Sequence, residues 1–251
     1  MLSKTMKEYL IFRIYGMMAS WGDIAIRDFR PSFDHPSKSA IMGMVAAAIG
    51  IRRDEEERLS ELAAGYLMAV RIETTGILMR DFHTAQVPPL KKIDGNEIVF
   101  PTRKAELSVP IDKAIISERD YRCDAVYSVC LWCRTASPPY PLTILKGHLE
   151  KPTFNLYLGR KSCPPSLPLE PQVVLADTIS NVFSSVQFHD GLFLTGLEYD
   201  RDIRIFWEGD DDAGFAREQT IQRRDEPLSR RRWQFGSRTE HYAMIKKPAG
   251  G

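Results

Sequence analysis

The order of apolar segments in the first 165 residues constrains the fold of this chain more than any other feature. Short segments rich in β-branched and aromatic residues alternate with longer segments whose composition and end residues are typical of helices. The expected strands are Tyr9–Tyr15, Tyr66–Thr74, Tyr121–Cys133 and Thr153–Leu158. The expected helices are Ser37–Ile49, a helix that opens at Asp54, and Pro141–Glu150. The order is therefore strand, helix pair, strand, insertion, strand, helix and strand.

This order is the split β-α-β pattern of a ferredoxin-like sheet of the RNA-recognition type. The insertion covers 80–117, where prolines interrupt regular structure and Asp94-Gly95 gives a turn signal. We expect a protruding hairpin, because so long a connection without a helix of its own is uncommon inside a compact domain. The predicted fold class is α+β, with a modified ferredoxin-like (RRM-like) domain at 1–165 that includes a β-hairpin thumb at 80–117.

A β-rich C-terminal extension is expected after Pro164-Pro165, over residues 166–251 and packed on the first domain. Its strand-like segments are Gly191–Tyr199, Asp202–Trp207 and His241–Ile245. The pattern leaves open whether this region is a separate domain or extends the first one.

Composition indicates a folded cytoplasmic protein without a membrane span. Hydrophobic residues make up 43% of the 251 residues, which is enough for a large core, and no long apolar run is free of charges. The start of the chain lacks the pattern of a secretion signal, and four cysteines are too few to stabilise a chain of this size through disulfides. We therefore expect reduced thiols and a cytoplasmic location.

Charge is unevenly distributed although the formal net charge is only +1. From Arg217 to the end there are nine Lys or Arg residues against four Asp or Glu. Phosphate binding depends on local rather than total charge, so this asymmetry is compatible with a nucleic-acid-binding face. A solvated surface is the simpler explanation for any single run of charges.

The sequence contains no recognisable metal or cofactor motif. Cys130 and Cys133 have the spacing of a metal-binding pair, but residues three apart in a strand point to opposite faces. No second pair accompanies them, and the glycine-rich phosphate loops, the nucleophile elbow and the zinc-helix motif are missing. We expect no cofactor, no metal site and structural cysteines.

Three clusters that combine basic with aromatic or small residues carry the functional prediction. The first runs from Trp21 to Ser39 and leads into a helix amino terminus, whose free amides attract phosphate. The second, from Arg80 to Lys104, lies in the predicted hairpin. The third, Tyr157–Cys163, has a glycine that permits close backbone approach, followed by two cations. Each cluster alone is as typical of an ordinary protein surface as of a binding site. Together the three clusters predict that the protein binds single-stranded RNA through phosphate contacts and base stacking.

Two histidines offer a competing, catalytic interpretation. His35, before the first helix, and His83, at the base of the hairpin, suit metal-free ribonuclease chemistry in which a general base activates a ribose 2′-hydroxyl. A structural or RNA-contacting role is better supported, because neither histidine has a demonstrated catalytic partner. We therefore predict no catalytic residue.

Several ordered blocks along the chain have a familiar form. In the amino-terminal half they are YLIFRIYG at 9–16, MASWG at 18–22, PSKS at 36–39, GIRRD at 50–54 and RDFHT at 80–84. Further along they are ERDYRCDA at 118–125, YLGRKSCP at 157–164 and RDEP at 224–227. Together these blocks resemble the CasD family, the crRNA-handle-binding subunit of the type I-E CRISPR surveillance complex, Cascade. They span most of the chain and are far more specific than any lone motif.

The resemblance implies a RAMP-type ferredoxin-like domain with a thumb at about 80–117. It implies a non-catalytic protein of antiviral defence that grips the 5′ handle of the crRNA and caps the backbone filament. The implied partners are a CasC-like backbone subunit and a CasA-like large subunit that recognises the PAM, with target DNA held by the assembled complex. Type I-C relatives cut precursor RNA, so a metal-independent endoribonuclease is the alternative. An RNA-binding module outside CRISPR is a third class.

The predicted site draws on the three clusters and on the resembling blocks. Cationic side chains are expected to contact phosphates, while Trp21, Phe82 and His83 are available to stack on bases or contact their edges. The predicted RNA-binding residues are Trp21, Arg27, Arg30, Lys38, Ser39, Arg80, His83, Thr84, Arg103, Arg119, Arg160, Lys161 and Ser162.

Overall fold

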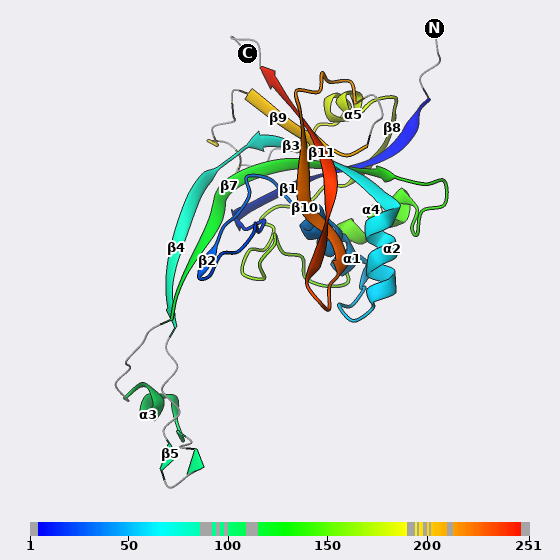
Figure 1. Cartoon of the computed structure of the whole chain (residues 1–251). Coiled ribbons are helices and arrows are strands. Elements are labelled where there is room, and N and C mark those ends of the chain that lie inside the picture. The colour runs from blue at the N-terminus through cyan, green and yellow to red at the C-terminus, as the bar shows by residue number, and fades with distance from the viewer. Residues whose placement is uncertain are drawn as a thin grey trace.

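The chain folds around one nine-stranded sheet in a computed structural model (Figure 1). The structure describes residues 5–85, 92–93, 96–97, 100–108, 115–189, 194, 196–197, 200, 202–209 and 213–246. The strands of the sheet are β1 (Lys7–Ala19), β2 (Phe29–Arg30), β3 (Tyr66–Thr74), β4 (Ile77–Ala85), β7 (Ile115–Cys133), β8 (Gln172–Ala176), β9 (Asp202–Trp207), β10 (Gln219–Ser229) and β11 (Gln234–Lys246). The main path through the sheet is β10-β11-β9-β3-β7-β1-β8, while β2 and β4 pair with β7 beside it.

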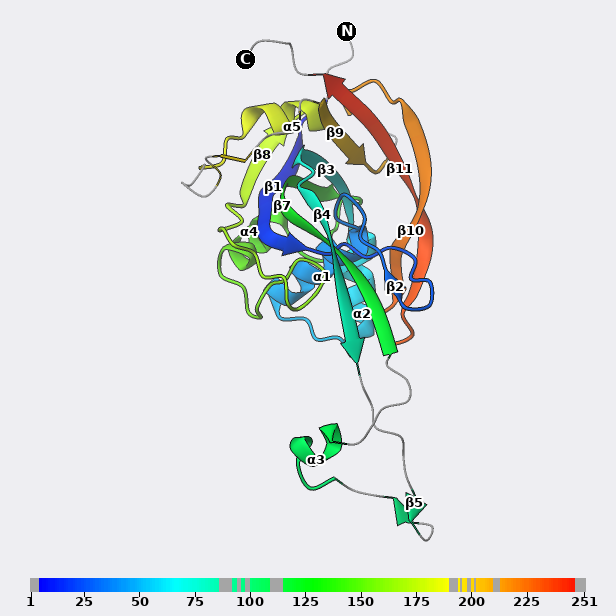
Figure 2. The ribbon, with the colours of Figure 1, turned by 90° about the vertical axis from the view of Figure 1, so that its left-hand side faces the viewer.

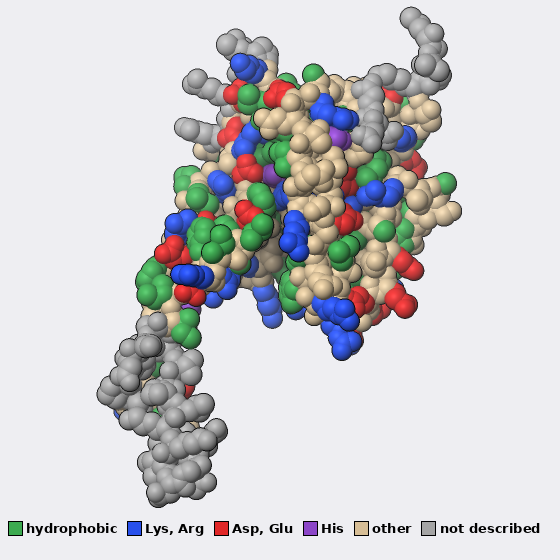
Figure 3. All heavy atoms as spheres, viewed as in Figure 1, with side chains coloured by type: hydrophobic (Ala, Val, Ile, Leu, Met, Phe, Trp, Pro, Cys, Tyr) green, Lys and Arg blue, Asp and Glu red, His purple; other side chains and the backbone are tan. Residues whose placement is uncertain are grey.

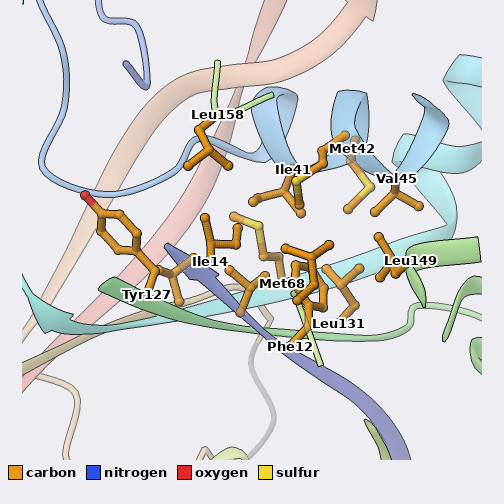
Figure 4. Close-up of a cluster of buried hydrophobic side chains, with 14 of the residues drawn as sticks. Phe12, Ile14, Ile41, Met42, Val45, Met68, Tyr127, Leu131, Leu149 and Leu158 are labelled. Atoms are coloured by element: carbon orange, nitrogen blue, oxygen red, sulfur yellow. The ribbon is translucent and has the colours of Figure 1, made fainter. Parts of the chain in front are cut away.

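The centre of the sheet is covered on both faces (Figures 1 and 2). Helices α1 (Lys38–Ile49), α2 (Glu56–Gly65) and α4 (Leu142–Glu150) lie on one face, and α5 (Ile179–Ser185) lies on the other. In β1, Phe12 points toward the helical layer, and its neighbour Ile11 points toward α5. Figure 4 shows Phe12 among the side chains of the main core, which fills the space between the sheet and α1.

Helix α1 begins and ends where the sequence predicts. The side chain of Ser37 accepts a hydrogen bond from the Ala40 backbone N–H at 3.2 Å, which satisfies one free amide of the first turn. Gly50 ends the helix in the left-handed conformation. The helix is apolar nearly all round because the sheet, α4, α2 and β10 all contact it.

A two-stranded stem projects from the body of the molecule (Figure 1). Strand β4 pairs with the first half of β7, from Ile77 opposite Cys123 to Ala85 opposite Ile115. Beyond the stem lie the short strands β5 (Lys92–Ile93) and β6 (Asn96–Glu97) and a five-residue helix, α3 (Arg103–Leu107). The protruding hairpin is confirmed, whereas its short helix was not expected. The predicted turn at Asp94-Gly95 lies outside the described residues.

The C-terminal region continues the same sheet rather than forming a separate one. Strand β9 pairs with β3, and β11 pairs with β9. Strands β10 and β11 form a long hairpin, called the arm below, that crosses α1 and α2 on one side of the molecule (Figure 2). The predicted strands Asp202–Trp207 and His241–Ile245 are confirmed, the second as part of β11. Strands β8 and β10 and helix α5 are not predicted by the sequence.

One predicted strand is wrong, and another lies largely outside the described residues. Residues 153–158 form a loop, because the Thr153 and Phe154 amides donate to the Ala48 and Ala47 carbonyls at the end of α1, at 2.9 and 3.1 Å. The sheet position beside β1 is taken by β8 instead. Of the predicted strand 191–199, only 194, 196 and 197 are described, and none of them is in a strand. Within the described residues, no helix combines the length and the apolar character needed to cross a membrane.

Candidate nucleic-acid interface

A groove of about 1400 Å³ lies between the arm and the loops that flank α1. Its walls are residues 20–25 and 30–35 after β1, one side of α1, residues from the 154–160 loop and the arm. In Figure 3 the surface is hollowed between the hairpin stem and the arm. This volume exceeds the roughly 300–1,000 Å³ of small-molecule sites, so the groove suits an extended ligand.

Arginine dominates the charge of the groove. Its acidic lining residues are Asp23, Asp34, Asp225 and Glu240, and the last three are in ion pairs with arginines. The remaining surplus of positive charge favours a polyanion. The arginines that line the groove are Arg30, Arg52, Arg53, Arg122, Arg160, Arg223, Arg224 and Arg230.

Arg122 and Arg160 carry buried donor groups without an acceptor. Arg122 Nε and Arg160 Nη1 have no hydrogen-bond partner among the described residues. A buried donor left unpaired costs about 1–3 kcal/mol. The Arg160 guanidinium lies 4.7 Å from the centroid of the Tyr121 ring, which holds it at the wall. Both side chains also line the groove, where a phosphate oxygen can contact the guanidinium nitrogens that the fold leaves accessible.

Gly159 brings Arg160 to this wall. Its φ of 81° is a left-handed conformation, and a Cβ here would overlap the carbonyl oxygen of Ser20. The Ser20 N–H also donates to the Leu158 carbonyl at 3.0 Å, so this loop lies against the end of β1. The close backbone approach expected at this glycine is therefore made by the protein's own chain.

Lys38 is buried and paired, which corrects the prediction that it contacts phosphate. Its side chain is 0% exposed, and Nζ lies 3.2 Å from Glu208 Oε2 and 3.0 Å from Glu226 Oε2. Its backbone N–H donates to Asp225 Oδ2 at 2.9 Å. Lys38 thus joins the amino terminus of α1 to β10 and to the end of β9. A buried ammonium group must be paired, and here the carboxylates of the fold pair it.

Trp21 is a core residue, which corrects its predicted stacking role. It is 4% exposed, and its Nε1 donates to the Tyr127 hydroxyl at 3.0 Å. The two rings meet edge to face with centroids 5.5 Å apart. Burial raises the pKa of Tyr127, so its hydroxyl stays protonated and donates to the Asp34 carbonyl at 2.9 Å.

His35 lies beside the groove with both ring nitrogens engaged. Nδ1 is 2.7 Å from Asp34 Oδ1, and Nε2 is 3.2 Å from Glu240 Oε2. The ring stacks on Phe206 at 3.7 Å. Burial would raise the pKa of Glu240, but the hydrogen bond from His35 and the neighbouring guanidinium groups hold it well below its usual range. His35 therefore bridges two carboxylates that belong to different walls of the groove.

The predicted residues of the hairpin lie outside the groove. Arg80 on β4 pairs with Asp120 at 2.8 Å and lies over the Phe29 ring. Arg103 on α3 pairs with Glu106, and Arg119 Nε contacts Ser117 Oγ at 3.4 Å. The predicted residues on the stem or beyond it are Arg80, His83, Thr84, Arg103 and Arg119.

The groove brings together only part of the predicted site. Trp21, Arg30, Ser39 and Arg160 line it, whereas Arg27, Lys161 and Ser162 are exposed and do not. Groove residues that the sequence did not predict are the arginines of the arm, Arg52 and Arg53 after α1, and Trp233. The basic runs at Arg223-Arg224 and Arg230-Arg231-Arg232 were the available signal, but sequence does not reveal that the arm folds back over α1.

Two solved structures share the fold. A chain of a structure titled "CRISPR RNA-guided surveillance complex" superimposes with a TM-score of 0.63 and 25% identity, over 95% of this chain and 89% of that one. A structure titled "Crystal structure of Cas protein" gives a TM-score of 0.58 and 23% identity, over 95% of each chain. The large antiparallel sheet with its helices is thus an architecture found in CRISPR-associated proteins.

The sequence comparisons identify a family within the CRISPR-associated proteins. The family model of the CRISPR-associated protein Cas5 matches residues 9–240. The Cascade subunit CasD of Escherichia coli (strain K12) is 31% identical over 174 residues, which cover 65% of this chain and 70% of that protein. The chain therefore belongs to the CRISPR-associated Cas5 family, which includes CasD-like proteins, and the resemblance noted in the sequence is confirmed.

Proposed function

We propose that this protein is the guide-RNA-binding subunit of a type I-E CRISPR surveillance complex and that its groove holds the 5′ handle of the crRNA. The single observation that carries the proposal is the arginine-lined groove, in which buried donors of Arg122 and Arg160 lack an acceptor among the described residues. Membership of the Cas5 family and the similarity to a Cascade subunit support it. RNA phosphates in the groove would contact these arginines and neutralise their charge.

The proposed role is binding without cleavage. A general base must reach a ribose hydroxyl through a free ring nitrogen. Both ring nitrogens of His35 contact carboxylates in a buried setting, and His83 lies on the hairpin stem away from the groove lining. These placements favour a structural role for His35. The metal-independent endoribonuclease remains the second candidate, because His35 is itself a lining residue of the groove.

In the proposed complex, the other parts of the protein form the core domain and the surfaces that contact partner subunits. We place the modified ferredoxin-like RAMP core in β8, β1, β7 and β3 with α1 and α4, because these elements have the order and antiparallel pairing of that fold. The stem acts as the thumb that contacts a CasC-like backbone subunit at the end of the filament. A CasA-like large subunit is the other partner, and the assembled complex holds target DNA.

A binding experiment with matched variants tests the proposal. Labelled handle RNA is titrated with wild-type protein, with Arg160→Gln and with Lys161→Gln, the neighbouring cation that does not line the groove. We expect Arg160→Gln to weaken binding about three- to tenfold and to reduce the salt slope by about 0.7, since one phosphate contact is lost. Lys161→Gln should match wild type. Equal loss in both variants would remove the groove from the site.

A cleavage assay separates the two candidates. Repeat RNA is incubated with the protein in EDTA, and its length is followed on a denaturing gel. A binding subunit leaves the RNA intact and co-purifies with Cascade subunits. Specific cleavage that is lost in His35→Ala or His83→Ala would establish the nuclease and overturn the non-catalytic role.

A further inference from the structure

The turn at the tip of the arm presents an exposed tryptophan to the groove. Trp233 is 57% exposed and lines the groove, whereas Trp21, Trp132 and Trp207 are buried. Large aromatic side chains are usually buried away from water. An exposed ring beside a basic groove is a surface on which a base can stack.

The backbone at Trp233 is strained. Its φ is 51°, a left-handed conformation that glycine or asparagine adopts readily and that a bulky side chain rarely does. A tight hairpin turn normally has a small residue at such a position. Strain of this kind at an exposed ring is more typical of a binding position than of a purely structural turn.

One guanidinium group lies over this ring, and a second is close enough to the first to be repelled by its charge. Arg53, after α1, lies 5.1 Å from the Trp233 ring centroid. Arg230 also lines the groove, and burial together with the charge of Arg53 lowers its pKa. Neither arginine has an ion pair with a carboxylate among the described residues. Two like charges held together without a counterion favour an anion between them.

Arg230 is positioned by α1. Its Nη2 donates to the Ser39 carbonyl, and Gly43 leaves room for the guanidinium. A Cβ at Gly43 would stand 3.0 Å from Arg230 Nη2, so a methyl group would push the guanidinium by a few tenths of an ångström. The guanidinium is thus held in one place before any ligand arrives, which lowers the entropic cost of binding.

We infer that Arg53, Arg230 and Trp233 form a nucleotide-binding site at the tip of the arm, in which one RNA phosphate lies between the two guanidinium groups and the adjoining base stacks on the open face of Trp233. The inference rests on the proposed function and deepens it, because it assigns one nucleotide of the bound strand to one set of residues. The stacking is tolerant of base identity, since every base has an aromatic face.

Tryptophan fluorescence and abasic RNA test the site. Trp233 is the exposed tryptophan, so its fluorescence should be quenched by iodide. Handle RNA should quench the same fluorescence, and Trp233→Gly should abolish this quenching. Trp233→Gly should weaken handle binding about tenfold without lowering the unfolding temperature, because glycine suits the backbone of the turn. Arg53→Gln and Arg230→Gln should weaken binding and reduce its salt slope, and Gly43→Ala should weaken binding while the protein stays folded.

A series of handle RNAs, each with one abasic position, identifies the nucleotide. At one position, removal of the base should weaken binding to the wild type as much as Trp233→Gly weakens binding of intact RNA. When the abasic RNA is combined with Trp233→Gly, the two losses in binding free energy should not add. Additive losses at every position, or unquenched emission in a protein that binds the handle normally, would overturn the site while leaving the proposed function intact. Loss of partner co-purification with normal RNA binding in Trp233→Gly would also overturn it. Failure of the wild type to bind the handle would instead refute the proposed function.

Discussion

Lys38 and Arg160 are both cations beside the groove, and their surroundings give them different roles. Lys38 is fully buried, with its ammonium group between Glu208 and Glu226. Arg160 lines the groove and has a donor without an acceptor among the described residues. Charge already neutralised by the fold is unavailable to RNA, whereas an unpaired donor gains from a phosphate.

Lys38→Met is therefore expected to affect stability rather than recognition. Removal of Lys38 takes the buried cation away from Glu226 and leaves Glu208 paired with Arg238, and loss of one partner of a buried ion pair costs about 3–5 kcal/mol. Urea unfolding should show this loss, and Lys161→Met at an exposed position should change the unfolding free energy by less than about 0.5 kcal/mol. A Lys38→Met protein of normal stability but weak handle binding would contradict this assignment and restore the phosphate contact.

At the scale of single elements, a substitution at Gly159 tests whether the 157–160 loop must pack closely against the end of β1 to form the wall of the groove. Gly159→Ala should destabilise the protein by about 2–4 kcal/mol, because the new Cβ meets the Ser20 backbone and the left-handed φ is itself unfavourable. It should also weaken handle binding by displacing Arg160.

Gly147→Ala is the matched control, since Gly147 lies in α4 and its Cβ would meet no atom within 4 Å. This change should stabilise the protein by about 0.5–1 kcal/mol. Equal unfolding free energies for the two variants, measured in urea, would show that the 157–160 loop does not depend on close approach at Ser20.

The elements that sequence predicts well are those with local signals. Strand β3 is apolar and ends at a turn, and α1 has a serine cap and a glycine stop, so both were predicted within about one residue. Strand β10 has charged residues at the positions that face inward, Arg223 and Asp225, and no hydrophobic pattern reveals it. Residues 153–158 have strand composition, but their backbone groups bond to the end of α1. Such tertiary partners are not visible in a sequence.

The residues of the candidate site also divide into those with a local sequence signal and those without one. Arg30 and Arg160 lie in recognisable clusters and were predicted. Arg53, Arg122 and Trp233 come from three distant segments that meet only when the arm folds across α1. Their convergence depends on sheet topology, so local pattern was unable to identify them.

Considered as a whole, the molecule exposes apolar residues on both faces of its projecting stem, and Figure 3 shows those on one face. Phe82 is 61% exposed and Ile115 is 56% exposed, and alternation along paired strands places them on opposite faces. A patch of this kind usually marks a surface that a partner covers.

Phe82→Ser and Ile115→Ser are expected to lower co-purification with the proposed CasC-like backbone subunit. Each should change the unfolding free energy by less than about 0.5 kcal/mol, because neither side chain is in the core. Leu175→Ser, at an exposed position on β8, is the control and should leave co-purification unchanged. Full recovery of the complex with both stem variants would show that the stem is not an interface.

The attachment of the arm to the rest of the molecule should depend on pH. Glu240 in β11 has a pKa well below its usual 4.5, and Asp34 across the groove has a lowered pKa because of His35 and Arg204, despite burial. A lowered pKa in the folded state means that the unfolded chain binds more protons below pH 4.5. Stability is then complete above that pH and falls as the pH drops toward the folded-state values.

Between pH 6 and pH 3 the Glu240 contribution should decrease by about 2 kcal/mol. Glu208 works in the opposite sense, because burial raises its pKa and its protonation on acidification relieves a cost of folding. The effect of Glu240 is therefore isolated by comparing wild type with Glu240→Gln, whose unfolding free energy in urea should fall less steeply over this range. Asp34→Asn gives an independent comparison. Parallel pH profiles for all three proteins would show that the ionised Glu240 and Asp34 do not stabilise the folded state.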